Sequence, residues 1–249
     1  MSPGIVGQPD RPTRRWCHAA TALDHFALIT WAVAPEKLER LLPDGFVPEV
    51  RDGRSFVSMV PFVDRRFHFR CAPFAPVTCG QVNYRAYVRR GDETGVWFFG
   101  TSLDSVFVLL PRLAWKMPWH RDRLVVDGSW DATGCSGYRL EATGAWGGAS
   151  VSMHGTGRPL STPPSFDDGR DASRIVLDPF VGWYARRDGS GIGRYSVWHE
   201  PLALEEASVE HARCQVFTDL GVIELDEPPL WAGVQRRIAF DVHTPPVRA

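Results

Sequence analysis

Short segments rich in β-branched and aromatic residues follow one another along most of the chain, and each is bounded by Gly, Pro or Asp. This pattern predicts strands rather than helices. Asp52-Gly53 and residues 188–191 are typical of hairpin turns, and residues 90–95 are expected to join two paired strands. The expected strands comprise residues 54–62, 80–88, 96–102, 138–143, 149–154 and 238–243.

Helical segments are few. The candidates are residues 35–42, 105–115 and 204–214. Asp104 comes directly before the second candidate and is expected to cap its N-terminus. We therefore expect a predominantly β fold with a few packed helices.

The chain is expected to form a single domain over residues 16–249, after a disordered tail over residues 1–15 that is rich in Pro and Gly. The Pro-rich stretch 159–171 is the best internal linker candidate, but the strand pattern resumes after it without a change in composition. The longest apolar stretch, residues 26–34, is far shorter than the roughly 18 residues of a membrane span. These features predict a cytoplasmic protein with no membrane partner.

Charge and cysteine content exclude several classes of function. The 249 residues carry a net charge of -1, so no overall positive potential would attract nucleic acid. The five cysteines have irregular spacing and form neither a disulfide framework nor a metal-binding motif, and the eight histidines lack metal-ligand spacing. We therefore expect no metal, no cofactor and a small molecule as the partner, and a homo-oligomer stays open.

Lys116 is one of only two lysines, against 26 arginines, and it lies in the apolar segment Trp115-Lys116-Met117-Pro118-Trp119. Desolvation in such surroundings lowers the pKa of an amine and makes it nucleophilic, as a Schiff-base lysine requires. Alternatively, the side chain packs its methylene groups against a tryptophan and extends its amine to water. The sequence leaves both interpretations open.

The predicted strand over residues 80–88 has one wholly polar face. Strand alternation puts Gln81, Asn83, Arg85 and Tyr87 on that face and apolar residues on the other. The polar face of an antiparallel sheet ordinarily meets solvent. If the sheet instead curls into a barrel, this row lines the interior, where Arg85 would bind a carboxylate. Both arrangements fit the sequence.

A series of motifs occurs in order over about residues 26–125, with a further patch at 194–204. The motifs are Trp31, residues 35–43, Val60-Pro61-Phe62, residues 83–88, residues 95–99, Ser102-Leu103-Asp104, Arg112, Pro118, Arg194-Tyr195 and His199-Glu200-Pro201. They resemble the uncharacterised DUF2071 or YqjF-like family, which looks like a branch of the acetoacetate decarboxylase superfamily. The resemblance implies an α+β fold, mainly antiparallel β, in which an acetoacetate decarboxylase-like β-barrel with a few packed helices encloses a small-molecule cavity.

In acetoacetate decarboxylases a lysine forms a Schiff base with the substrate ketone, and a neighbouring cation, an arginine and a glutamate complete the cavity. The resemblance puts Trp119 at the position of that lysine and His120 at its neighbour, whereas Lys116 falls where the family motif has glycine. It likewise puts Ala32 at the arginine and Gln81 at the glutamate. These departures imply that ordinary acetoacetate decarboxylation is lost, while the pocket is kept for other chemistry.

Three functions follow as alternatives. The first is a cofactor-independent lyase, isomerase or cyclase acting on a carbonyl- or carboxylate-bearing metabolite in a buried cavity. The second is a non-catalytic small-molecule-binding protein or sensor, and the third is a Schiff-base decarboxylase or aldolase that uses Lys116. We expect Lys116, Arg85 and His120 to be catalytic, with His199 as a further acid–base candidate because histidine titrates near neutrality. The expected substrate-binding residues are Gln81, Asn83, Tyr87, Trp31, Trp97, Trp115 and Trp119.

Overall fold

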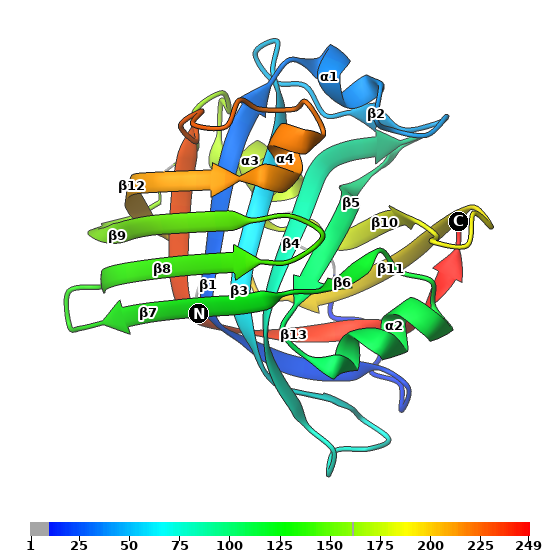
Figure 1. Ribbon diagram of the computed structural model, residues 1–249. Coiled ribbons are helices and arrows are strands. Elements are labelled where there is room, and N and C mark those ends of the chain that lie inside the picture. Colours follow the sequence, from blue (N-terminus) through cyan, green and yellow to red (C-terminus); the bar gives the residue numbers. More distant parts are fainter. Residues whose placement is uncertain (1–9, 161) are drawn as a thin grey trace.

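The computed structural model describes residues 10–160 and 162–249, and most of its strands belong to one sheet, part of which closes into a barrel (Figure 1). Seven strands form the barrel in the order β1-β3-β4-β5-β10-β11-β13, and β13 pairs back onto β1. Neighbouring barrel strands are antiparallel except β5 and β10, which are parallel. The barrel strands are β1 (Ala19–Val33), β3 (Ser55–Phe69), β4 (Val77–Arg90), β5 (Glu93–Leu103), β10 (Val181–Ala185), β11 (Ile192–His199) and β13 (Trp231–Arg248).

A second antiparallel layer continues from β13 and crosses the outside of the barrel (Figure 1). A short pairing of Glu205 with Val234 and of Glu206 with Gly233 joins the two parts. The layer then runs β12 (Glu205–Cys214), β9 (Ala149–Pro159), β8 (Cys135–Thr143) and β7 (Arg123–Trp130). It covers β1, β3, β4 and β5, so these four barrel strands are buried on both faces.

The remaining elements are short. Strand β2 (Val47–Pro48) pairs with β4, and β6 (Trp119–Arg121) pairs with β5. The helical segments are α1 (Pro35–Glu39), the 3-10 turn η1 (Val106–Val108), α2 (Leu109–Ala114), α3 (Gly169–Ala172), the π-helical turn η2 (Ser173–Leu177) and α4 (Gln215–Asp219).

Two large apolar clusters result from this arrangement, beside a small third one of Cys79, Leu103 and Val108. The inter-sheet core lies between the barrel and the second layer and includes Trp31, Trp97 and Phe217. The barrel interior includes Phe26 and Phe62 and is the second large cluster. Successive residues of a strand point to opposite faces, so each covered barrel strand contributes alternate side chains to the two clusters.

Strand β4 shows this division most clearly. Val82, Tyr84, Ala86 and Val88 belong to the inter-sheet core, whereas the polar row that starts at Gln81 faces the barrel interior. Of the two arrangements that fit the sequence, the structure therefore has the interior one. The sheet curls, and the polar face is enclosed instead of meeting solvent.

The six predicted strands all overlap observed strands, but one helix prediction and one cap prediction were wrong. Of the predicted helix 204–214, residues 205–214 form strand β12, because the segment pairs with β9 and buries Ala207 and Cys214 against the barrel. Register shifts interrupt its alternation, which hid the strand pattern. The cap of η1 is Ser105, whose hydroxyl accepts from Phe107 N at 3.2 Å. Asp104 instead accepts from Gly80 N at 2.9 Å.

The predicted N-terminal tail lies partly outside the described residues, which begin at residue 10. Within the described part, Arg11 and Arg14 both bind the buried carboxylate of Asp241, at 2.6 and 3.0 Å. The guanidinium of Arg11 also lies 4.4 Å above the ring of Trp198. The segment before β1 is thus attached to the outer wall of the barrel.

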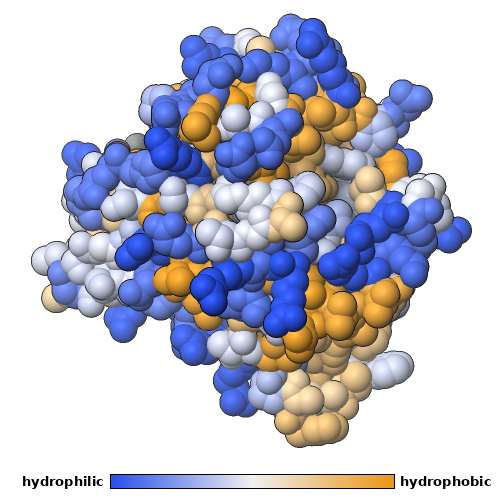
Figure 2. Space-filling view, viewed as in Figure 1, coloured by the Kyte–Doolittle hydropathy of each residue, from blue (hydrophilic) through white to orange (hydrophobic). Residues whose placement is uncertain are grey.

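The outer surface is polar over most of the second layer, and apolar side chains gather over α2 (Figure 2). Val106, Leu109 and Leu113 are all more than half exposed there. A homo-oligomer, which stays a prediction, would bury apolar surface of this kind.

Candidate ligand-binding and active site

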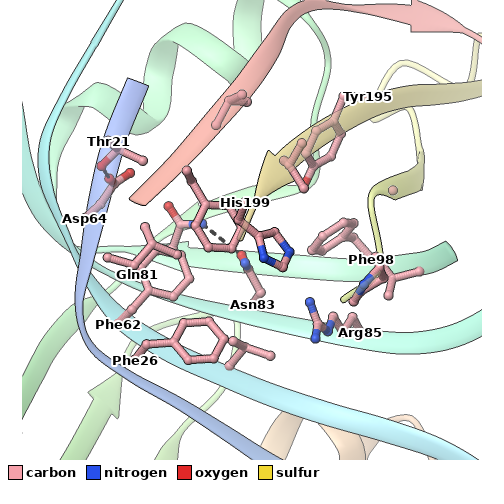
Figure 3. Close-up of a pocket in the computed structure, with 18 of the residues that line it drawn as sticks. Thr21, Phe26, Phe62, Asp64, Gln81, Asn83, Arg85, Phe98, Tyr195 and His199 are labelled. Carbon is pink, nitrogen blue, oxygen red and sulfur yellow. Dashed lines mark hydrogen bonds between the residues drawn. The ribbon is translucent and has the colours of Figure 1, made fainter. Parts of the chain in front are cut away.

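One cavity of about 120 Å³ lies inside the barrel (Figure 3). Its walls are mainly apolar, with residues such as Phe26, Val60, Phe62 and Phe98. A few polar side chains interrupt these walls, as is typical of small-molecule sites. The polar lining residues are Thr21, Asp64, Gln81, Asn83, Arg85, Tyr195 and His199.

Strand β4 supplies an ordered pair of amides to the cavity. Gln81 Nε2 donates to Asn83 Oδ1 at 2.9 Å, and Thr101 Oγ1 donates to the same oxygen at 3.0 Å. These two bonds use the acceptor of Asn83 and leave its Nδ2 hydrogens as the donors for a ligand. A carbonyl oxygen is the group that such donors bind.

Arg85 is nine-tenths buried and faces the same cavity. Its Nη2 donates to the hydroxyl of Tyr87 at 3.2 Å, and that hydroxyl lies 2.7 Å from Ser58 Oγ. Its Nε has no hydrogen-bond partner, and no carboxylate among the described residues lies within ion-pair distance of the guanidinium. A buried charge is costly unless it is paired, so the site favours an anion.

His199 lies in the cavity wall near Arg85 (Figure 3). Its Nδ1 lies 2.8 Å from the carbonyl oxygen of Glu200 and therefore carries the hydrogen. Burial is the main cause that lowers the pKa of His199, and the positive charge of Arg85 acts in the same direction. The ring packs on Phe240 at 4.3 Å. The neutral imidazole therefore has its lone pair at Nε2.

Asp64 lies at the other end of the cavity, beside Thr21 (Figure 3). The hydroxyl of Thr21 donates to Asp64 Oδ1. Burial raises the pKa of Asp64 to about 7, although the Thr21 bond opposes this shift. Asp64 was not among the site residues predicted from the sequence. Its signal was the alternation of Val60, Phe62 and Asp64, which puts all three on the face that lines the cavity.

Lys116 and His120, which were expected to be catalytic, are not among the described residues that line the cavity. Lys116 follows α2 with φ 56°, a left-handed conformation in which a glycine commonly ends a helix. His120 points away from the interior and stacks on Trp146 with the ring centroids 4.1 Å apart. Burial lowers the pKa of His120 to about 4.

The expected substrate-binding residues divide by strand face. Trp31 and Trp97 lie in the inter-sheet core because they occupy the outward positions of β1 and β5. Trp115 packs beside the interior cluster without lining the cavity, and Tyr87 is fully buried behind Arg85. Trp119 does line the cavity. Together with Gln81, Asn83 and Arg85, it makes four expected residues that the fold brings together.

The described residues contain no group of three or more His, Cys, Asp or Glu side chains arranged to hold a metal ion. Among these residues there is also no helix of the length and hydrophobicity that crossing a membrane requires.

Solved structures with the same fold belong to acetoacetate decarboxylase-like proteins. An acetoacetate decarboxylase-like enzyme from Sphingomonas wittichii RW1 is 11% identical, with a TM-score of 0.63 over 95% of this chain and 94% of that one. The acetoacetate decarboxylase of Legionella pneumophila is 12% identical, with a TM-score of 0.61 over 95% and 91%. The enduracididine biosynthesis enzyme MppR, complexed with the condensation product of pyruvate and imidazole 4-carboxaldehyde, is 11% identical, with a TM-score of 0.62 over 97% of each chain. These likenesses establish the barrel fold.

No curated protein matches the sequence. The model of a family described as uncharacterized conserved proteins matches residues 20–235, which is most of the chain. The chain therefore belongs to the DUF2071 family, and its fold is that of acetoacetate decarboxylase-like proteins.

Proposed function

We propose that the protein is an enzyme that acts on a small metabolite with a carboxylate and a carbonyl group, by proton transfer and without a Schiff-base lysine. The observation that carries this proposal is the buried guanidinium of Arg85, which faces the cavity without a carboxylate partner among the described residues. A ligand carboxylate would supply that partner in a charge-assisted, two-pronged contact. The reaction would be that of a lyase, an isomerase or a cyclase.

The amides of β4 support a second contact. With its Oδ1 occupied by Gln81 and Thr101, Asn83 has amide hydrogens to donate to a carbonyl oxygen. The same donors would stabilise an enolate oxygen, because negative charge develops there when a proton leaves the adjacent carbon. Apolar walls that include Phe62 and Phe98 would exclude water and strengthen both contacts.

His199 is the acid–base group that the geometry favours. Its lowered pKa keeps the ring neutral at pH 7, so it can accept a proton from the carbon next to the carbonyl. The electron pair of the broken C–H bond moves to the carbonyl oxygen. Return of the proton to another carbon gives an isomer, loss of a leaving group gives a lyase product, and attack within the molecule closes a ring.

Imine chemistry has little support. The sequence has only two lysines, and neither Lys37 nor Lys116 is among the described residues that line the cavity. The proposal therefore assigns no imine step. MppR, of similar fold, is complexed with a condensation product of pyruvate, which supports the idea that a barrel of this kind can hold a 2-oxo acid derivative.

A non-catalytic binding protein is the second candidate. It is favoured by Trp119, which occupies the cavity wall at the position where the decarboxylase resemblance has the lysine. Binding through Arg85 would be the same in both cases. Only turnover separates the two.

Deuterium exchange tests the proposal. The protein is incubated in D₂O with pyruvate, 2-oxobutyrate and 2-oxoglutarate, and loss of the C3 proton signal is followed by NMR. We expect exchange with the wild type and a decrease of at least 100-fold in both Arg85→Met and His199→Gln, since a positioned acid–base group typically contributes about 10² to 10⁴. Arg85-dependent binding without exchange of any of the three would overturn the enzyme and support the binding protein. A borohydride-trapped adduct on a lysine would contradict the mechanism.

A further inference from the structure

Asp64 is a buried carboxyl group that the proposed mechanism does not use. It is nine-tenths buried in the cavity wall, and its Oδ1 accepts a hydrogen bond from the hydroxyl of Thr21. Among the described residues, no Lys, Arg or His side chain forms an ion pair with it. Its neighbour Arg65 binds Asp24 instead, at 2.9 Å. The cavity therefore contains a carboxyl group without a cation.

The same cavity contains a cation without an anion at its other end. Arg85 pairs across the sheet with Ser58, and Asp64 lies six positions further along β3. At about 3.3 Å per residue this separates the two backbone positions by about 20 Å, which the side chains shorten as they extend into the cavity. Figure 3 shows Asp64 and Thr21 at one end, Arg85 at the other, and the amides of Gln81 and Asn83 between them. The wall between the ends includes Phe62 and Val60.

We propose that the cavity binds a metabolite with a carboxylate at one end and an amine or guanidinium at the other, with the carboxylate on Arg85 and the cation on Asp64. The inference rests on the proposed function for the Arg85 end and extends it to the class of substrate. Each charged end of such a ligand forms an ion pair with a buried group that otherwise has no oppositely charged partner. The apolar chain between the ends packs against the walls.

This arrangement also discriminates against related ligands. A simple carboxylic acid leaves Asp64 unpaired, and a dicarboxylic acid brings two like charges together at Asp64. A simple amine leaves Arg85 unpaired. Specificity therefore comes from the unpaired groups as much as from the new contacts.

Binding of the cationic end depends on ionisation of Asp64. The groups that face this carboxyl are the hydroxyl of Thr21 from β1 and the thiol of Cys79 from β4. Burial raises the pKa of Cys79 to about 12, so the thiol is neutral in the working range. With the pKa of Asp64 at about 7, the preference for a cationic ligand should increase as the pH rises from 6 to 8.

Calorimetric titration with matched probes tests the inference. One series consists of ω-amino acids from 4-aminobutanoate to 8-aminooctanoate, so that the correct chain length is included. The controls of equal length are the unsubstituted acid, the dicarboxylic acid and the alkylamine. We expect the best amino acid to bind wild type at least tenfold more tightly than its unsubstituted acid, with the dicarboxylic acid weaker than both. This comparison needs no variant.

Two variants locate the ends. In Asp64→Asn the tenfold preference for the amino acid should vanish, while the unsubstituted acid binds as before. In Arg85→Met, binding of both the amino acid and the unsubstituted acid should be lost. If acids bind through Arg85 with no preference for the amino compounds at any length, the inference fails and the proposed function stands. If no acid depends on Arg85, the proposed function itself fails. A preference that persists in Asp64→Asn also overturns the assignment of the cation to Asp64.

Discussion

The two faces of β4 are both buried, yet they lie in different kinds of core. On one face Val82, Tyr84 and Val88 pack into the inter-sheet core, which contains no charged side chain in its buried cluster. On the other face Asn83 and Arg85 enter a cavity, where Nε of the charged Arg85 has no hydrogen-bond partner. The comparison indicates that stability and binding are divided between the two sides of one strand. Substitutions on the two faces should therefore separate the two properties.

The largest effect is expected on the stability side. Trp31→Ala removes a fully buried side chain from the inter-sheet core and should lower the free energy of unfolding by about 3 to 5 kcal/mol. For a chain of this length that corresponds to a fall in Tm of roughly 6 to 20 °C. Trp119→Ala, on the cavity side, is the matched control and should cost less stability while changing ligand binding. Equal losses of Tm in the two variants would contradict the division.

The next effect is expected on the binding side. Arg85→Met removes the charge that the ligand carboxylate meets and should weaken carboxylate binding by about 3 kcal/mol, or roughly 150-fold. Its Tm should stay the same or rise, because an unpaired buried charge is removed. Titration calorimetry and thermal unfolding of the same sample check both parts. A large fall in Tm would mean that the guanidinium stabilises the fold instead of serving a ligand.

An effect of a different kind, which depends on pH, is expected from Asp64 in the barrel interior. Its pKa in the folded protein, about 7, lies above the ordinary value of 3.8, so the folded state binds the proton more tightly. The stabilising contribution of Asp64 to the free energy of unfolding is complete below pH 4 and is lost as the pH rises to 7. The free energy of unfolding changes by at most about 1.4 kcal/mol per pH unit over this range. Urea unfolding of wild type and Asp64→Asn between pH 4 and 8 measures the difference. The free energy of unfolding of Asp64→Asn should increase relative to that of the wild type as the pH rises.

The opposite slope is expected from His120, which stacks on Trp146 at the edge of the inter-sheet core. Its pKa in the folded protein, about 4, lies below the ordinary 6.5, so the unfolded state binds the proton more tightly. Stability should therefore fall as the pH falls from 6.5 to 4, and His120→Gln should lack this loss. Because the ring is only partly buried, the slope should be well below that of a full proton. If the contributions of Asp64 and His120 to the free energy of unfolding changed with pH in the same direction, the environments of these two residues would be alike.

The smallest effect is expected from Lys116. Lys116→Gln should change carboxylate affinity less than twofold, because the side chain is not among the described lining residues. Borohydride trapping with pyruvate, followed by mass spectrometry, should give no adduct on the wild type. An adduct that disappears in the variant would restore the Schiff-base alternative.

The sequence predicted the strands and part of the site for a common reason. Alternation alone puts Gln81, Asn83 and Arg85 on one face, and closure of the sheet turns that face inward. Alternation cannot tell which face of a strand lines the cavity, and Trp31 and Trp97, which were expected to bind substrate, lie in the inter-sheet core. That distinction depends on which strands the second layer covers, and this is set by contacts between distant segments.

Asp64 and Lys116 illustrate the other limit. Asp64 lies two residues beyond the predicted strand 54–62, and a buried carboxylate is ordinarily unfavourable, so it was not predicted to line a cavity. Lys116 was predicted to be reactive because its neighbours are apolar. In the structure its distinctive property is the left-handed backbone angle with which the chain leaves α2. In both cases the decisive property is the environment that the closed barrel creates around the side chain.

The closure between β1 and β13 has a consequence for how the protein is made. Ala19 pairs with Val242 and Thr30 with Trp231. Strand β1 therefore cannot pair with β13 until nearly all of the chain between them has been synthesised. Contacts of such long sequence separation form slowly, because the entropy of the intervening loop is lost before they are gained. Until β13 emerges from the ribosome, β1 has an open edge and the cavity has a missing wall. Binding competence is therefore expected to arise late and in a single step, which pulse-labelled ligand capture on stalled chains of increasing length would follow.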